Sequence, residues 1–186
     1  TTNTTGGYSI TTSQQAMVNA VNARLTGPAS NSIYITQTGN SDNINITQVG
    51  SNNRIDGATN TSNGPGYTTA AQIAGGSNAI TIRQHSNNNL IDLAATGGSN
   101  TLNLNQGTDA TGMSTGLDQG GHYQFDYVNG TGNNITVVQE NTTTGAGQFS
   151  SLAVVGNLNT VGITQTGTAR NQLFASVAGK IGRAHV

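Results

Sequence analysis

Asparagine and glutamine side chains recur at a fixed interval in this chain. Gln37 and Gln48 stand eleven residues apart, and Asn31 and Asn53 stand two such intervals apart. A primary amide both donates and accepts hydrogen bonds, so amides stacked one above another can form a continuous ladder. A buried amide without partners costs about 1–3 kcal/mol, and stacking removes that cost. The spacing therefore predicts that these amides stack and hydrogen-bond to one another in ladders.

The same interval places amides along most of the chain. The predicted assembly ladder consists of Asn31, Gln37, Gln48, Asn53, Gln72, Asn78, Gln84, Asn89, Asn100, Gln106, Asn133, Gln139, Asn159 and Gln165. On the first of two sheets we expect a glutamine ladder of Gln37, Thr59, Gln84, Gln106, Gln139 and Gln165, and a matching asparagine ladder of Asn31, Asn53, Asn78, Asn100, Asn133 and Asn159. An end rung would present unpaired groups that another copy can continue.

Aliphatic residues alternate with polar ones between the amides, as the two-residue period of a strand requires. Short turns rich in Gly, Ser and Asn separate the alternating segments. The predicted core is Ile33, Ile35, Ile44, Ile46, Ile80, Ile82, Ile91, Leu93, Leu102, Leu104, Ile135, Val137, Leu152, Val161 and Ile163.

These elements predict an all-β fold, namely a strand-turn-strand β-solenoid of about six rungs with two parallel sheets face to face and a short N-terminal helix. One sheet is expected to contain 32–37, 54–59, 79–84, 101–106, 134–139 and 160–165. The other is expected to contain 43–48, 67–72, 90–95, 123–128, 149–154 and 171–176.

Residues 122–128 test the register. Counting back eleven residues from Asn133 turns His122, Gln124 and Asp126 inward, whereas the opposite phase buries the aromatic residues 123, 125 and 127. A large apolar side chain gains roughly 2 kcal/mol on burial, so we expect the aromatic residues inside.

Residues 31–48 resemble the curlin repeat, in which Asn or Ser, five residues, Gln, four residues, Asn, five residues and Gln follow one another, although Asp42 replaces the second Asn. The resemblance spans about 31–177. It implies a structural subunit of a secreted, curli-like extracellular amyloid fibre that serves a biofilm matrix, adhesion or surface colonisation. It further implies self-association into a homopolymer, with a nucleator subunit and a secretion pore as additional partners.

Three segments divide the chain. Residues 1–30 are expected to be a flexible segment with a capping helix near 13–25, and residues 31–178 the curlin-like solenoid. Residues 180–186 break the repeat and resemble the translation of a sequencing-adapter read-through, with a genuine basic tail as the competing interpretation.

Composition excludes several partners. The net charge is −1, which provides no basic field for nucleic acid. No apolar run is long enough for a transmembrane helix, so membrane insertion is not expected, and the absence of Cys excludes thiol chemistry. Weak charge also means weak repulsion between copies.

Catalysis and cofactors are not expected. His85, His122 and His185 are not spaced as a nucleophile, base and orienting group, and Asp118, His122 and Asp126 match no metal motif, which favours surface residues. Two alternatives to the amyloid fibre stay open. In one, a phage or cell-surface fibre or adhesin uses the solenoid as a rigid spacer, and the loops 57–66 and 107–121 bind a ligand. In the other, outward threonines form an ice-binding face, namely Thr36, Thr47, Thr81, Thr101 and Thr136.

Overall fold

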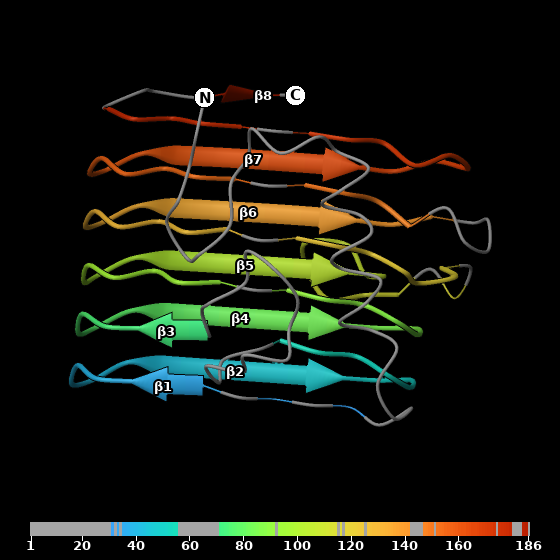
Figure 1. Cartoon of the computed structure of the whole chain (residues 1–186), viewed down its shortest axis with the longest axis horizontal. Coiled ribbons are helices and arrows are strands. Elements are labelled where there is room, and N and C mark those ends of the chain that lie inside the picture. The colour runs from blue at the N-terminus through green and yellow to red at the C-terminus, as the bar shows by residue number, and fades with distance from the viewer. Residues whose placement is uncertain are drawn as a thin grey trace, which may run out of the picture.

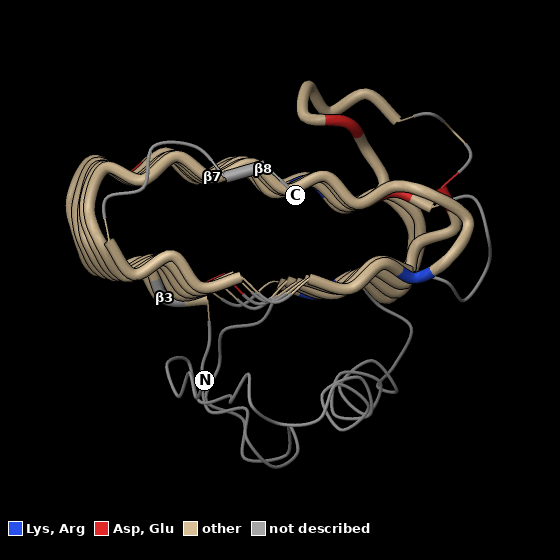
Figure 2. Tube along the Cα trace, turned by 90° about the horizontal axis from the view of Figure 1, so that it is seen from above, with Lys and Arg blue, Asp and Glu red and all other residues tan. Residues whose placement is uncertain are grey.

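The computed structural model describes residues 31, 33, 35–55, 71–91, 93–114, 116, 118–124, 126–141, 147–150, 152–173, 175–179 and 184–185. Within them the chain winds between two flat layers, which turns connect on both sides (Figures 1 and 2). Seen along the stacking direction, successive coils superimpose as one flattened loop (Figure 2).

One layer, which lies at the top in Figure 2 and is called the upper layer, is a parallel sheet of six-residue strands. They are β2 (Asn43–Gln48), β4 (Ala79–Gln84), β5 (Thr101–Gln106), β6 (Asn134–Gln139) and β7 (Thr160–Gln165). Each strand pairs along its whole length with the next, without any shift (Figure 1). Beyond β7, β8 (Ala184–His185) pairs with Val161 and Gly162. Equivalent residues of successive strands therefore form straight columns.

The lower layer is less regular. It contains the parallel pair β1 (Ile35–Gln37) and β3 (Ala71–Ile73), and then 89–95, 122–128, 148–154 and 171–177. Main-chain bonds from Arg54 to Asn89, Leu90 to His122, Tyr123 to Gln148 and Phe149 to Asn171 hold these segments side by side. Left-handed φ values interrupt the extended backbone at Leu93, Ala95, Asp126 and Tyr127. The lower layer is therefore stacked in register but bends within each coil.

Two segments that are distant in sequence share one strand position of the lower layer. Arg54 forms a bridge to Leu90 and Ile73 forms one to Ala95, so 53–55 and 71–73 lie along the two halves of 89–95. Residues 56–70 are thus inserted in sequence within one strand. This insertion corrects the predicted sheets, because 43–48 stacks on 79–84 and residues 35–37 lie in the opposite layer. The prediction counted 54–59 and 67–72 as two complete strands in different sheets, whereas 53–55 and 71–73 occupy one strand position.

A continuous aliphatic core fills the space between the layers. Its buried members include Ile80, Ile82, Ile91, Leu93, Leu102, Leu104, Ile135, Val137, Leu152, Val161 and Ile163. In the first coil, Ile35, Ile44 and Ile46 are half-buried. Ile33 is 49% exposed, which corrects its assignment to the core. Ile33 belongs to the terminal coil, and no described strand lies beyond it.

One turn of each coil carries a glycine that packs on the glycine of the next coil. The column consists of Gly39, Gly75, Gly97, Gly130, Gly156 and Gly179. A Cβ atom added to Gly97 would lie less than 3.0 Å from the main chain of Asn129 and Gly130. Close approach of adjacent turns therefore requires the absence of a side chain, which is a second role for glycine beside its freedom in turns.

The aromatic register prediction is wrong. His122, Gln124, Asp126 and Val128 have no exposed surface, and Val128 belongs to the core cluster between the layers. Tyr123 is only 4% exposed on the other side of the lower layer, where its ring packs edge-on against Phe149 at 6.2 Å and Arg170 lies over it at 5.1 Å. The ladder bonds of His122 determine which side chains of this segment face the core. Because Tyr123 is also buried, against Phe149 on the outer side, the free energy gained by burying its ring does not favour one register over the other.

Several predicted features lie outside the described residues, namely the helix near 13–25, the loop 57–66 and most of 180–186. Within the described part, no helix has the length and apolarity to cross a membrane.

Candidate functional site

A glutamine ladder runs through the whole upper layer. Each Nε2 donates to the Oε1 of the next glutamine along the chain, from Gln48 to Gln84 (2.7 Å), Gln106 (2.9 Å), Gln139 (3.0 Å) and Gln165 (2.9 Å). The last four members are at most 5% exposed. Gln48 is the first member instead of Gln37, because β2 belongs to the upper layer. Residue 59, also predicted here, lies outside the described residues.

The same glutamines connect the two layers. Nε2 of Gln84, Gln106 and Gln139 donates to the main-chain oxygens of Arg54 (2.6 Å), Leu90 (2.6 Å) and Tyr123 (2.7 Å), and Gln165 donates to that of Phe149. Each of these amides therefore satisfies a carbonyl of the lower layer as well as the ladder. Sequence periodicity predicts the ladder, but it does not reveal these bonds across the core.

An asparagine ladder runs along the opposite end of the same strands. The side-chain nitrogen and the main-chain nitrogen of each member both donate to Oδ1 of the previous member, at 2.8–3.2 Å. The members are Asp42, Asn78, Asn100, Asn133 and Asn159. Asn78 and Asn100 also donate to Gly75 O and Gly97 O of their own turns. This ladder thus fixes the glycine turns, and its donors point toward earlier strands, opposite to those of the glutamine ladder.

Asp42 ends the asparagine ladder with a carboxylate. It accepts two bonds from Asn78, while Gln37 Nε2 donates to its Oδ2 at 2.7 Å and to Gly39 O. The Gln37 amide, followed by the Asn78 donors, keeps the pKa of Asp42 below its usual value. Gln37 therefore supplies the donors that an asparagine at position 42 would have provided.

A third ladder lies in the lower layer and contains Asn31 and Asn53. The prediction that these two residues belong to the same ladder as Asn78 is therefore wrong. The main-chain nitrogen of each member donates to the side chain of the previous one, at 2.8–3.1 Å. The members are Asn31, Asn53, Asn89, His122, Gln148 and Asn171. By register Gln72 of β3 pairs with Thr36 of β1, and its predicted place in a ladder concerns a side chain outside the described part of the structure.

His122 is an imidazole within this amide ladder. Its Nδ1 accepts from Gln148 N at 3.0 Å, and its Nε2 lies 2.9 Å from Asp118 Oδ2, which also accepts from Asn141 N. These contacts select the tautomer with the proton on Nε2. Burial raises the pKa of Asp118, but the bonds from His122, Asn141 and Gly120 outweigh it and lower the pKa overall.

The sequence favoured surface positions for Asp118, His122 and Asp126. This prediction is wrong, because all three residues are at most 8% exposed. Asp126 bonds instead with Gln124 at 2.8–2.9 Å. Among the described residues, no group of three or more His, Cys, Asp or Glu side chains could hold a metal ion. The pair of Asp118 and His122 supports the fold at the point where the long loop rejoins the stack.

The His122→Asn variant tests this role. Asparagine keeps an acceptor for Gln148 N but loses the donor to Asp118, so we expect the free energy of unfolding to fall by about 1–2 kcal/mol. His122→Ala, which removes both contacts, should cost more. Urea unfolding of the two variants measures the difference, and equal losses would contradict a ladder role for His122.

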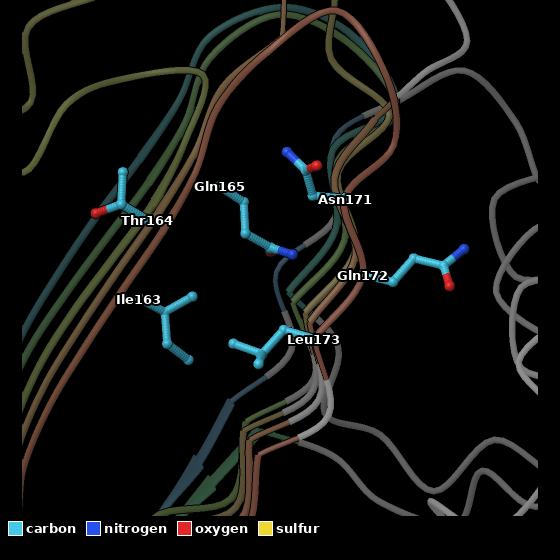
Figure 3. Close-up of a pocket in the computed structure, with 6 residues that line it drawn as sticks. All are labelled: Ile163, Thr164, Gln165, Asn171, Gln172 and Leu173. Carbon is cyan, nitrogen blue, oxygen red and sulfur yellow. The ribbon is translucent and has the colours of Figure 1, made fainter. Parts of the chain in front are cut away.

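The last coil borders a cavity. A cavity of about 230 Å³ lies between the end of β7 and the segment 171–173, lined by Ile163, Thr164, Gln165, Asn171, Gln172 and Leu173. In Figure 3 the Gln165 amide points into the space between the layers, with Ile163 and Leu173 beside it, whereas Gln172 points away. Ladder and core residues therefore line this cavity, although Gln165 and Ile163 themselves stay buried.

The threonines do not share one column. Thr36 lies in β1, Thr47 and Thr101 occupy two different columns of the upper layer, and Thr81 and Thr136 share a third with Asn103 between them. No observation thus favours the ice-binding alternative.

No protein-family model, no curated protein and no solved structure matches this chain. The parallel sheet with its stacked Asn and Gln side chains is the feature that an amyloid-like repeat would have.

Proposed function

We propose that this protein is a secreted structural subunit of a curli-like extracellular fibre, built as a β-solenoid of about six rungs that adds further copies end to end. Its role is in a biofilm matrix, adhesion or surface colonisation and is not catalytic. Besides other copies, a nucleator subunit and a secretion pore would be its partners. The resemblance of residues 31–48 to the curlin repeat supports the biological part of this proposal.

The observation that carries the proposal is the unshifted register of β2, β4, β5, β6 and β7 together with the amide ladders through them. Main-chain groups and amides along such a stack repeat at about 4.8 Å, so an additional coil finds the same partners as an internal one. Low net charge, −1 in the whole chain, leaves little repulsion between copies.

The lower layer of the two ends matches column by column. It contains one segment more than the upper layer, because 171–177 follows β7. If the first coil of one copy is placed on the last coil of another, Asn31 continues the column of Asn171, and Ile33 would cover Leu173. In the upper layer one strand position then lies between β7 and β2 of the added copy, on the side where β8 pairs with β7. This head-to-tail arrangement repeats one interface without closing a ring.

Fibre formation is tested by incubating the full chain and recording thioflavin fluorescence and fibre diffraction. We expect a cross-β reflection near 4.8 Å. A chain that stays monomeric at high concentration would refute the proposed function.

Engineered cysteines test the head-to-tail register. Asn31 and Asn171 are exposed and are the first and last members of one column in the lower layer, and the chain has no native Cys. In the proposed stack their Cα atoms lie about 4.8 Å apart in neighbouring copies, within disulfide range. Asn31→Cys with Asn171→Cys should therefore give disulfide-linked ladders of copies after assembly, whereas either single variant should not. Fibres of the double variant without such crosslinks would exclude this register.

The rigid-spacer alternative has one observation in its favour. The loop after β5 lies on the outer face of the upper layer, where Asn103 donates to Ala110 O and Arg83 contacts Gly112, and Met113 is 70% exposed. An adhesin or phage fibre would use such a loop for binding. Binding to cells that is lost on shortening this loop, without fibre formation, would favour this alternative.

A further inference from the structure

One position in the core is polar where the other coils are apolar. The column of Gln124 contains Ile91 in the preceding coil and Ser150 in the following one, and the column of Asp126 contains Leu93 and Leu152. The register follows from the bonds of Leu90 N to His122 O and of Tyr123 N to Gln148 O. Gln124, Asp126 and Ser150, which we call the core polar cluster, have no exposed surface.

The cluster is incompletely satisfied. Gln124 Nε2 donates to both carboxyl oxygens of Asp126, at 2.9 and 2.8 Å. Gln124 Oε1 and Ser150 Oγ, both buried, have no hydrogen-bond partner. A buried amide oxygen or hydroxyl in this state costs free energy, and a charged carboxylate in the same place costs more. Proton loss from Asp126 would thus add a charge to a part of the core that already contains polar atoms without hydrogen bonds.

The inward residues of the neighbouring coils and of the facing layer carry no charge next to Asp126. The inward residues of the preceding coil are Asn89, Ile91, Leu93 and Ala95, and those of the following coil are Gln148, Ser150, Leu152 and Val154. Across the core lie Leu102, Leu104, Ile135 and Val137. None of these described residues is ionisable. The titratable groups on its own segment are His122, which bonds to Asp118; Tyr123, which packs against Phe149 and Arg170; and the neighbouring Tyr127.

We propose that the protonation of Asp126 controls the stability of the stack, because the core polar cluster packs between the layers only when this carboxyl is neutral. Acidification would then strengthen the fold and alkaline conditions would weaken it around residues 122–128. This inference concerns the single chain and holds whether or not copies assemble.

The sign follows from proton linkage. Burial, opposed in part by the Gln124 bond, raises the pKa of Asp126 from 3.8 to about 7. The unfolded chain therefore releases this proton above about pH 4, while the folded chain keeps it until about pH 7. Stability is full below the unfolded value, falls through this window and levels off above it. The folding equilibrium constant should decrease about tenfold per pH unit between pH 5 and 7.

The experiment compares urea unfolding of the full chain, of Asp126→Asn and, as the control, of Glu140→Gln from pH 5 to 8.5. Burial first, and then the nearby Asp118 and Asp109 carboxylates, also raise the pKa of Glu140, so Glu140→Gln shows how much of the pH dependence comes from that group. We expect a slope of about tenfold per pH unit in Glu140→Gln, at least that slope in the wild-type chain, and a much smaller one in Asp126→Asn. Equal slopes in the wild-type chain and Asp126→Asn would overturn the proposal.

A second measurement needs no variant and decides the matter if Asp126→Asn fails to fold. Carbon NMR of the wild-type chain, labelled at the Asp carboxyl carbons and assigned by residue, follows each titration. We expect the Asp126 carbon to titrate near neutral pH, and that of Asp42 below the usual pKa of an aspartate. Titration of Asp126 below pH 5 would exclude the proposed control.

Discussion

Gly97→Ala is expected to lower the free energy of unfolding by about 3 kcal/mol or more. The added Cβ would lie less than 3.0 Å from main-chain atoms of Asn129 and Gly130 in the next coil. Main chain cannot move aside as the end of a flexible side chain does, and a shift of this turn would disturb the bonds of Asn100 to Gly97 O and to Gly130 O. Denaturant unfolding measures the loss.

Gly162→Ala is the matched control for this prediction. Gly162 lies in β7, and a Cβ atom there would meet nothing within 4 Å. Alanine restricts the unfolded chain, so this variant should be neutral or more stable by up to about 1 kcal/mol. A Gly97→Ala variant as stable as Gly162→Ala would show that the turns do not need their glycine column.

The second large effect is expected for Gln106→Met, which keeps the side-chain length but removes the amide. Gln106 accepts from Gln84 and donates to Gln139 and to Leu90 O, and it has no exposed surface. Its loss leaves buried polar groups of three residues with fewer partners, each costing about 1–3 kcal/mol. We therefore expect a loss of about 3 kcal/mol or more in the free energy of unfolding.

Gln172→Met provides the comparison, because Gln172 is exposed and points away from the core (Figure 3). Its midpoint in urea should hardly change. If Gln106→Met shifted the midpoint no further than Gln172→Met, the glutamine ladder would be a passive result of the fold and not a source of its stability.

Much of this fold can be predicted from residue spacing alone. Gln84, Gln106, Gln139 and Gln165 each end a segment of alternating aliphatic residues, and the structure places all four in one buried ladder. The same holds for the asparagines that begin these segments, from Asn78 to Asn159. Local periodicity suffices here because stacking in register repeats one environment in every coil.

What spacing could not provide is the layer of the first coil and the contents of the core near Asp126. An insertion such as 56–70 leaves the alternation of apolar and polar residues intact on both sides of it. The eleven-residue spacing no longer holds across the insertion, so only the pairing of 43–48 with 79–84 shows to which layer 43–48 belongs. At 122–128, the ladder bonds of His122 fix which side chains face the core, and Tyr123 is buried against Phe149 on the outer side, so the aromatic residues do not indicate the register. Bonds across the core, such as that from Gln139 to Tyr123 O, join residues whose spacing follows no repeat.

The opposite directions of the two upper-layer ladders have an electrical consequence. Glutamine amides donate toward later strands and asparagine amides toward earlier ones, so their dipoles point in opposite senses along the stack. An α-helix accumulates a macrodipole as it lengthens, because all its peptide units align. Here the contributions of these two ladders largely cancel in every coil. Lengthening such a stack therefore adds little charge separation from the upper-layer amides between its two tips.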